Sequence, residues 1–130
     1  MQFTKTIIYV SDVAATLAFF EQAFGVATRN TNGSSYGELE IGGTTLVFAT
    51  AEAGAAHLPE TTTAAPSATG HVAFEIAFVA DDVEAAFQRA IDAGATAIQT
   101  PEVKPWGQTV SHLAGPDGIV IDLSSPAPTW

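Results

Sequence analysis

The sequence predicts an α+β fold made of two tandem βαβββ modules in a single domain of 130 residues. The main observation is an internal repeat: Asp12 returns as Asp82 at an offset of 70 residues, and Gly25 returns as Gly94 at an offset of 69. In each half the predicted order is strand, helix and then three strands. Because neither half closes a core alone, the repeat predicts that the two modules pair their sheets, as a cup of curved mixed sheet.

Composition supports a folded core and excludes several classes of function. Apolar residues make up 47% of the chain and charged residues 14%, which rules out global disorder. A net charge of −10 with only four Lys and Arg argues against binding to nucleic acid or to an anionic membrane. The absence of cysteine removes disulfides, zinc ribbons and iron–sulfur clusters. No stretch reads as a signal peptide or a membrane span, so we expect a cytoplasmic protein.

The first module is predicted over residues 1–49. Its first strand is predicted at residues 4–10, which are β-branched and aromatic. Ser11 then offers an N-cap, and apolar residues recur at helical spacing until Gly25 ends the helix. The three remaining strands are predicted at residues 26–31, 36–41 and 44–49.

Residues 50–70 are predicted to form an exposed linker or lid, because they are small, include two prolines and show no hydrophobic periodicity. A random coil of about 21 residues reaches roughly 25 Å, which permits the modules to pair within one chain or between two chains. We expect a homodimer.

The second module is predicted over residues 71–126. A strand at residues 71–80 leads to a helix that Asp81 caps, with Glu84 completing a capping box and Gly94 ending the helix. The remaining strands are predicted at residues 95–99, 108–114 and 119–124, with a Gly-Pro-Asp-Gly turn before the last one.

Several short motifs of the second half stand in the order found in one known superfamily: Phe74-Glu75-Ile76, Asp82-Val83-Glu84-Ala85-Ala86, Ala93-Gly94-Ala95, Pro105-Trp106-Gly107-Gln108, Gly115-Pro116-Asp117-Gly118 and Asp122-Leu123. With the repeat, these motifs resemble the vicinal oxygen chelate superfamily, which includes glyoxalase I, extradiol dioxygenases, fosfomycin resistance enzymes and bleomycin-binding proteins. The resemblance covers nearly the whole chain except the linker. It implies a glyoxalase/bleomycin resistance-like fold, in which the curved sheet forms a cup and ligands bind on its concave side.

The resemblance also implies positions for a divalent cation. Enzymes of the superfamily use a His on the first strand of each module, seven residues before the helix-start Asp, and a Glu on the final strand. In this chain Lys5 and Glu75 stand at the His positions and Asp122 stands at the Glu position. Strand alternation turns all three charged side chains toward the concave side.

Two interpretations of these residues stay open, beside the simpler one of a structural ion pair. In the first, Glu75 and Asp122 are oxygen ligands of a hard cation. In the second, the Lys5 ammonium stands where the metal charge would be and neutralises both carboxylates. The second is favoured, so no metal or other cofactor is expected, and a divalent metal ion is the alternative.

Aromatic residues and one histidine extend the candidate ligand site. Trp106, between proline and glycine and just before a strand, is either a hydrophobic plug or a platform for a planar ligand. Tyr9 and Tyr36 could add to such a platform. The alternation of its strand turns His112 toward the concave side, as a candidate for contact with the ligand.

We therefore expect a protein that binds and sequesters a small drug- or antibiotic-like molecule, aromatic or cationic, without the standard metal site. The alternative is a glyoxalase- or dioxygenase-like lyase or isomerase with a non-standard divalent metal site, in which Glu75 and His112 are the catalytic candidates. A domain with a vestigial concavity is the third possibility. The residues expected to bind the ligand are Lys5, Tyr9, Tyr36, Glu75, Trp106, His112 and Asp122.

Overall fold

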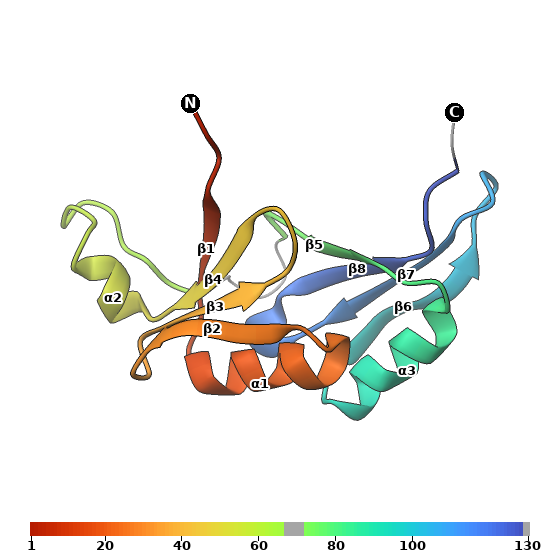
Figure 1. Ribbon diagram of the computed structural model, residues 1–130, viewed down its shortest axis with the longest axis horizontal. Helices are drawn as coiled ribbons and strands as arrows, with labels where there is room; N and C mark the ends of the chain where they lie inside the picture. Colours follow the sequence, from red (N-terminus) through yellow and green to blue (C-terminus); the bar gives the residue numbers. More distant parts are fainter. Residues whose placement is uncertain (67–71, 129–130) are drawn as a thin grey trace. The chain divides into compact units, whose positions relative to one another are not determined.

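The computed structural model describes residues 1–66 and 72–128 (Figure 1). The chain forms two compact units, Met1–Ser67 and Ala68–Trp130, and each contains one four-stranded mixed sheet. This confirms the predicted α+β fold of repeated modules. The end of the predicted linker and the first residue of the strand predicted at 71–80 lie outside the described residues. No helix in the described ranges is long and apolar enough to cross a membrane.

The first unit contains β1 (Lys5–Tyr9), α1 (Val13–Phe24), β2 (Ala27–Asn32), β3 (Tyr36–Glu40) and β4 (Thr45–Ala49). Its strand order is β1-β4-β3-β2, with β1 parallel to β4 and the other pairs antiparallel. Helix α1 packs against β2, β3 and β4. The core of the unit includes Phe20 and Phe48, both 0% exposed, with ring centroids 5.0 Å apart. Aromatic packing of this kind holds the helix on the sheet.

The structure differs from the prediction at the start of the linker, where α2 (Ala51–Ala55) follows β4. The Thr50 hydroxyl caps this short helix by accepting a backbone N–H at 3.2 Å. Gly54 is buried so closely that an added Cβ would lie 2.6 Å from the Cβ of Ala64 and 2.7 Å from the Tyr9 ring. The segment therefore packs onto the first unit. A helix of one turn is too short to produce a recognisable hydrophobic period.

The second unit repeats the order with β5 (Ile76–Val79), α3 (Val83–Asp92), β6 (Thr96–Val103), β7 (Thr109–Ala114), a 3-10 turn (Pro116–Gly118) and β8 (Val120–Ser124). Its strand order is β5-β8-β7-β6, with β5 parallel to β8. Helix α3 packs against β6, β7 and β8 (Figure 1). Leu113, Ile121 and Leu123 are at most 1% exposed. The residues that alternate with them point to the opposite side of the sheet, called here the open face.

Two strands of this unit differ in length from the prediction. β5 begins at Ile76, so Glu75 directly precedes it, and Phe74 is 38% exposed. β6 continues to Val103, past Pro101. An edge strand tolerates proline because one of its sides has no hydrogen-bonded neighbour.

Both helix N-caps lie one residue later than predicted. Asp12, not Ser11, caps α1, because its Oδ1 accepts a first-turn backbone N–H at 2.9 Å. Asp82, not Asp81, caps α3 through the same bond at 3.0 Å. Glu84 therefore stands one position too early to form a capping box. In both helices two adjacent residues, Ser11 and Asp12 or Asp81 and Asp82, have side-chain oxygens that could cap the helix. Only the backbone conformation decides which of the two does so.

Replacing the observed cap should destabilise the protein, and replacing its neighbour should not. We expect Asp82→Ala to lower the free energy of unfolding by about 1 kcal/mol, because a first-turn N–H loses its acceptor. Asp81→Ala, the matched control, should change it by less than about 0.5 kcal/mol. Urea denaturation of both variants measures the difference. Equal losses would contradict the assignment of Asp82 as the cap.

Candidate functional site

Polar side chains of three strands lie in one row on the open face of the second unit. Strand pairing places Ala77 beside Asp122, Asp122 beside His112, and His112 beside Gln99. Residues paired across neighbouring strands point to the same face of a sheet. Glu75 precedes Ala77 by two residues and so belongs to the same side.

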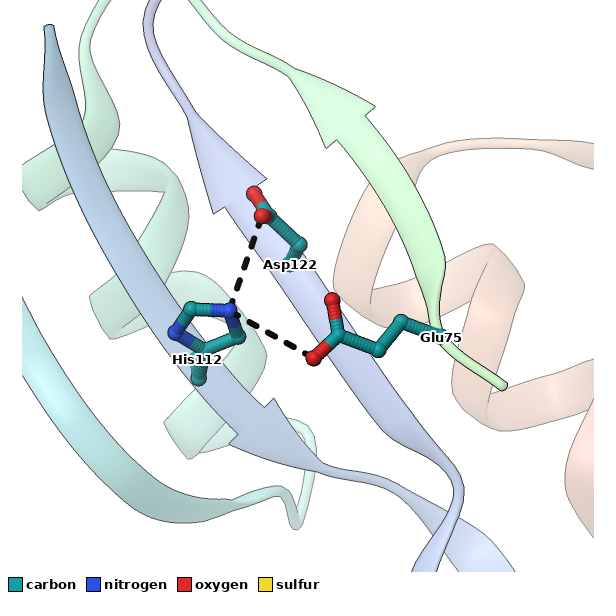
Figure 2. A group of neighbouring side chains, drawn as sticks. All are labelled: Glu75, His112 and Asp122. Carbon is teal, nitrogen blue, oxygen red and sulfur yellow. Dashed lines mark ion pairs between the residues drawn. The ribbon is translucent and has the colours of Figure 1, made fainter. Parts of the chain in front are cut away.

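Glu75, His112 and Asp122 form a carboxylate–imidazole cluster (Figure 2). The Nε2 atom of His112 lies 3.5 Å from Oδ2 of Asp122 and 3.8 Å from Oε1 of Glu75. One candidate ligand atom from each residue lies within 4.8 Å of the others. The side chains are 46%, 22% and 27% exposed for Glu75, His112 and Asp122, so a small molecule or ion can reach them.

Neighbouring side chains occupy the outer atoms of this cluster. The Ser124 hydroxyl donates a hydrogen bond to Oδ1 of Asp122, which leaves Oδ2 toward the imidazole. On the other side, Nδ1 of His112 lies 3.3 Å from Oε1 of Gln99. The inner atoms of the cluster are therefore the ones left for a ligand.

A groove of about 450 Å³ opens on the same face, and its lining includes Asp122, His112 and Trp106. Trp106 lies in the turn between β6 and β7, where Gly107 has a φ of +92° that favours glycine. The indole is 50% exposed, so it lines the groove as a surface rather than filling the core. Its Nε1 donates to Gln108 at 2.9 Å, and Gln108 donates to the Ser125 carbonyl at 2.8 Å.

The donor set of the cluster fits a divalent cation. One imidazole nitrogen and two carboxylate oxygens are ligand types that zinc and related divalent metals accept. Ligand atoms about 2.1 Å from one metal lie roughly 3 to 3.6 Å from each other, close to the 3.5 and 3.8 Å observed. His112 thus joins Glu75 and Asp122 as a third donor.

The sequence indicates His112 for contact with a ligand but not for metal binding, and it does not indicate Gln99. The sequence gives only part of the signal for the pairing of His112 with Asp122. The turn at Gly115–Gly118 makes β7 and β8 a hairpin, but counting outward from these four residues would pair His112 with Ile121. The observed pairing with Asp122 requires Ile119 in the loop as well, where its carbonyl accepts from the Gly115 N–H at 2.8 Å. No comparable signal marks Gln99, because the register of β6 shifts on both sides of it.

Lys5, Tyr9 and Tyr36, also predicted to bind ligand, lie in the first unit. The Lys5 ammonium is 6.0 Å from the centroid of the Tyr36 ring. Tyr9 contacts the α2 segment near Gly54. Their grouping with the second-unit residues stays a prediction.

The first unit carries a separate polar cluster around Glu38, which the sequence analysis did not single out. Glu38 accepts hydrogen bonds from Tyr36 at 2.7 Å, from Asn30 at 2.8 Å and from Arg29 at 3.2 Å. The hydrogen bond from Tyr36 is the main cause that lowers the pKa of Glu38. The same bond raises the pKa of Tyr36. The phenol of Tyr36 therefore remains a proton donor to a carboxylate that remains ionised.

Because the pKa of Glu38 is lower in the folded chain, its charge stabilises the fold above the ordinary pKa of 4.5. That stabilisation disappears as the pH falls through the lowered pKa. We expect Glu38→Gln to reduce the unfolding free energy at pH 7, and to reduce it progressively less as the pH falls below 4.5 and through the lowered pKa, because the wild-type carboxylate then gains a proton. Denaturant unfolding across this range measures the effect. Glu40→Gln on the same strand is the control, and an equal pH trend in both variants would refute the assignment.

Comparison with known proteins gives one family match. The model described as Glyoxalase/Bleomycin resistance protein/Dioxygenase superfamily matches residues 2–123. A search of curated proteins finds no match.

Solved structures of similar architecture cover nearly the whole chain. A glyoxalase/bleomycin resistance protein/dioxygenase family enzyme from Burkholderia phytofirmans PsJN is 24% identical with a TM-score of 0.81, covering 96% of this chain and 98% of that one. A glyoxalase-related enzyme from Fulvimarina pelagi is 20% identical with a TM-score of 0.78, covering 97% and 88%. A glyoxalase/bleomycin resistance protein/dioxygenase from Nocardioides is 15% identical with a TM-score of 0.77, covering 100% and 89%. At these identities the likeness shows the fold.

Proposed function

The chain belongs to the Glyoxalase/Bleomycin resistance protein/Dioxygenase superfamily, and from that premise we propose that it binds a small, flat, cationic molecule and sequesters it without turnover. The observation that carries this proposal is the groove of the second unit, where the exposed indole of Trp106 and the carboxylate of Asp122 line one cavity. A volume of about 450 Å³ suits a drug-sized ligand.

Charge supports a cationic ligand. Glu75 and Asp122 both present oxygens on this face, and a chain with a net charge of −10 attracts cations toward it. The face of an indole adds attraction for a cation and for a flat ring. Lys104 also lines the groove, but Glu102 lies 3.3 Å from its ammonium and offsets its charge.

Sequestration without turnover is supported by the residues at the positions where the superfamily resemblance implies metal-binding histidines. Those positions hold Lys5 and Glu75. An ammonium does not ligate a metal while it carries its proton. Assembly as a homodimer and a location in the cytoplasm, both expected from the sequence, stay predictions.

The binding proposal is tested by calorimetry and by quenching of Trp106 fluorescence with a panel of aromatic cations, in a Trp130→Phe background that leaves one tryptophan. We expect Asp122→Asn to weaken binding about ten- to a hundredfold, the loss typical of a hydrogen bond to a charged group. Asp81→Asn, a matched change at an exposed position before α3, should leave the affinity unchanged. The absence of binding and of quenching across the panel would overturn the proposal.

A second candidate function is favoured by one observation, the carboxylate–imidazole cluster. In a lyase, isomerase or dioxygenase with a non-standard metal, His112 and Asp122 would hold the ion, and Glu75 would be either a third ligand or the base. The ion would polarise a substrate oxygen as a Lewis acid. Glu75, the most exposed of the three, would be the residue free to move a proton as a base.

Metal analysis separates the two functions. Protein purified without chelator should contain less than one equivalent of Zn, Mn, Ni or Fe if it is the sequestering protein proposed here. A stoichiometric metal that His112→Ala removes would favour the enzyme instead. Gln88→Leu, an exposed change on α3, serves as the control that retains the wild-type metal content.

A further inference from the structure

We propose that Lys104 forms an anion subsite in the groove of the second unit, so that the preferred guest is a flat cation that also carries a carboxylate. The groove and its cationic guest are those of the proposed function, on which this assignment rests. The second charge of the guest follows from the order in which charged groups stand along the groove.

Lys104 stands at the base of the tight turn between β6 and β7. Its N–H donates to the Gln108 carbonyl at 2.8 Å, and its own carbonyl accepts from the Gly107 N–H at 2.8 Å. These bonds continue the strand ladder into the turn that carries Trp106, so alternation places Lys104 on the same side as Glu102. The Lys104 side chain is 22% exposed and lines the groove together with Trp106.

Hydrogen bonds connect the Lys104 ammonium to the polar row of the open face. The ammonium lies 3.3 Å from Oε2 of Glu102, and Nε2 of Gln99 donates to the same oxygen at 2.9 Å. These two contacts, that of Lys104 first, lower the pKa of Glu102, so this carboxylate is ionised and attracts the ammonium. Gln99 also lines the groove and lies 3.3 Å from the His112 ring. The ammonium is therefore positioned beside the groove.

The opposite end of the polar row is negative. β7 lies between β6 and β8, so the Lys104 end and the Asp122 end of the groove stand on either side of β7. Glu75 approaches Asp122 and His112 there, as Figure 2 shows. The groove is therefore dipolar, with an ammonium at one end and carboxylates at the other.

The ammonium keeps hydrogen-bonding capacity for a guest. A lysine ammonium has three N–H donors. Within residues 1–66 and 72–128, the acceptor at hydrogen-bond distance from Nζ is Oε2 of Glu102. Glu102 is 59% exposed, and the groove lining includes Lys104 but not Glu102. Glu102 thus offsets the charge of Lys104 while leaving N–H groups that a guest can use.

The two charged ends select a guest by the arrangement of its charges. A carboxylate depends on the Lys104 ammonium, because a chain with a net charge of −10 otherwise repels anions. Hydrogen bonds from an ammonium to a carboxylate are stronger than those between neutral groups. A guest that carries both charges satisfies both ends, whereas a guest with one charge leaves the other end unpaired.

Calorimetry with two probes built on one ring tests the subsite. The first probe is N-methylquinolinium, a flat cation, and the second is the same cation with a carboxylate on the ring that lacks the nitrogen. We expect wild type to bind the second probe about tenfold more tightly, the gain typical of a hydrogen bond between charged groups. Lys104→Gln should remove this preference and bind the plain cation at least as tightly as wild type, because a positive charge is lost. Lys104→Arg should retain the preference.

Arg89→Gln is the matched control, because it removes the same charge from α3, which packs on the face of the sheet opposite the groove. It should keep the wild-type preference. Equal binding of both probes by wild type, or a preference that survives in Lys104→Gln, overturns the inference and leaves the proposed function standing.

A third probe, naphthalene carboxylate, is flat and anionic but has no positive charge. If it alone binds wild type, and Lys104→Gln abolishes that binding, the Lys104 subsite is supported and the cationic guest of the proposed function is contradicted. The absence of binding of all three probes overturns both.

Discussion

A single helix covers one face of each four-stranded sheet, and this constraint determines which way the polar strand residues of the candidate site face. Apolar residues of β8 such as Ile121 and Leu123 turn toward the helix and are almost fully buried. Strand alternation then sends Asp122 and Ser124 to the uncovered side. Gln99 and His112 join them there because Gln99 pairs with His112, and His112 pairs with Asp122, across neighbouring strands. The site follows from the division of each strand between a covered and an open face.

The two units use equivalent positions in opposite ways. Glu38 pairs with the middle residue of β4, just as His112 pairs with the middle residue of β8. The next strand places Arg29 beside Glu38 and Gln99 beside His112. In the first unit the carboxylate already has a guanidinium partner at 3.2 Å. In the second unit the neutral amide of Gln99 stands at that position. It does not neutralise the carboxylates of Glu75 and Asp122, whose charge can then attract a bound cation. Equivalent positions thus hold a carboxylate–guanidinium pair in the first unit and an imidazole–amide pair in the second.

The fold and the direction of the candidate site residues could be predicted from the sequence, because both depend on local periodicity. Strand alternation alone predicts that Asp122 and His112 face one side, and the two residues are paired across β7 and β8. Contacts that depend on register or on small backbone shifts could not be predicted. Gln99 pairs with His112 in a strand whose register shifts on both sides of it. β6 runs past Pro101 because it is an edge strand, a position that the sequence does not reveal. The α2 helix escaped prediction because it is a single turn.

Trp106 is held in place by Gln108 and the Ser125 carbonyl, and this has an entropic consequence for recognition. An indole whose Nε1–H is already hydrogen-bonded would lose less rotamer freedom when a ligand arrives, so less of the contact energy would be lost to ordering. A flat ring would also cover more of the indole than a puckered or branched cation would. Planarity of the guest, as much as its charge, becomes a condition for tight association.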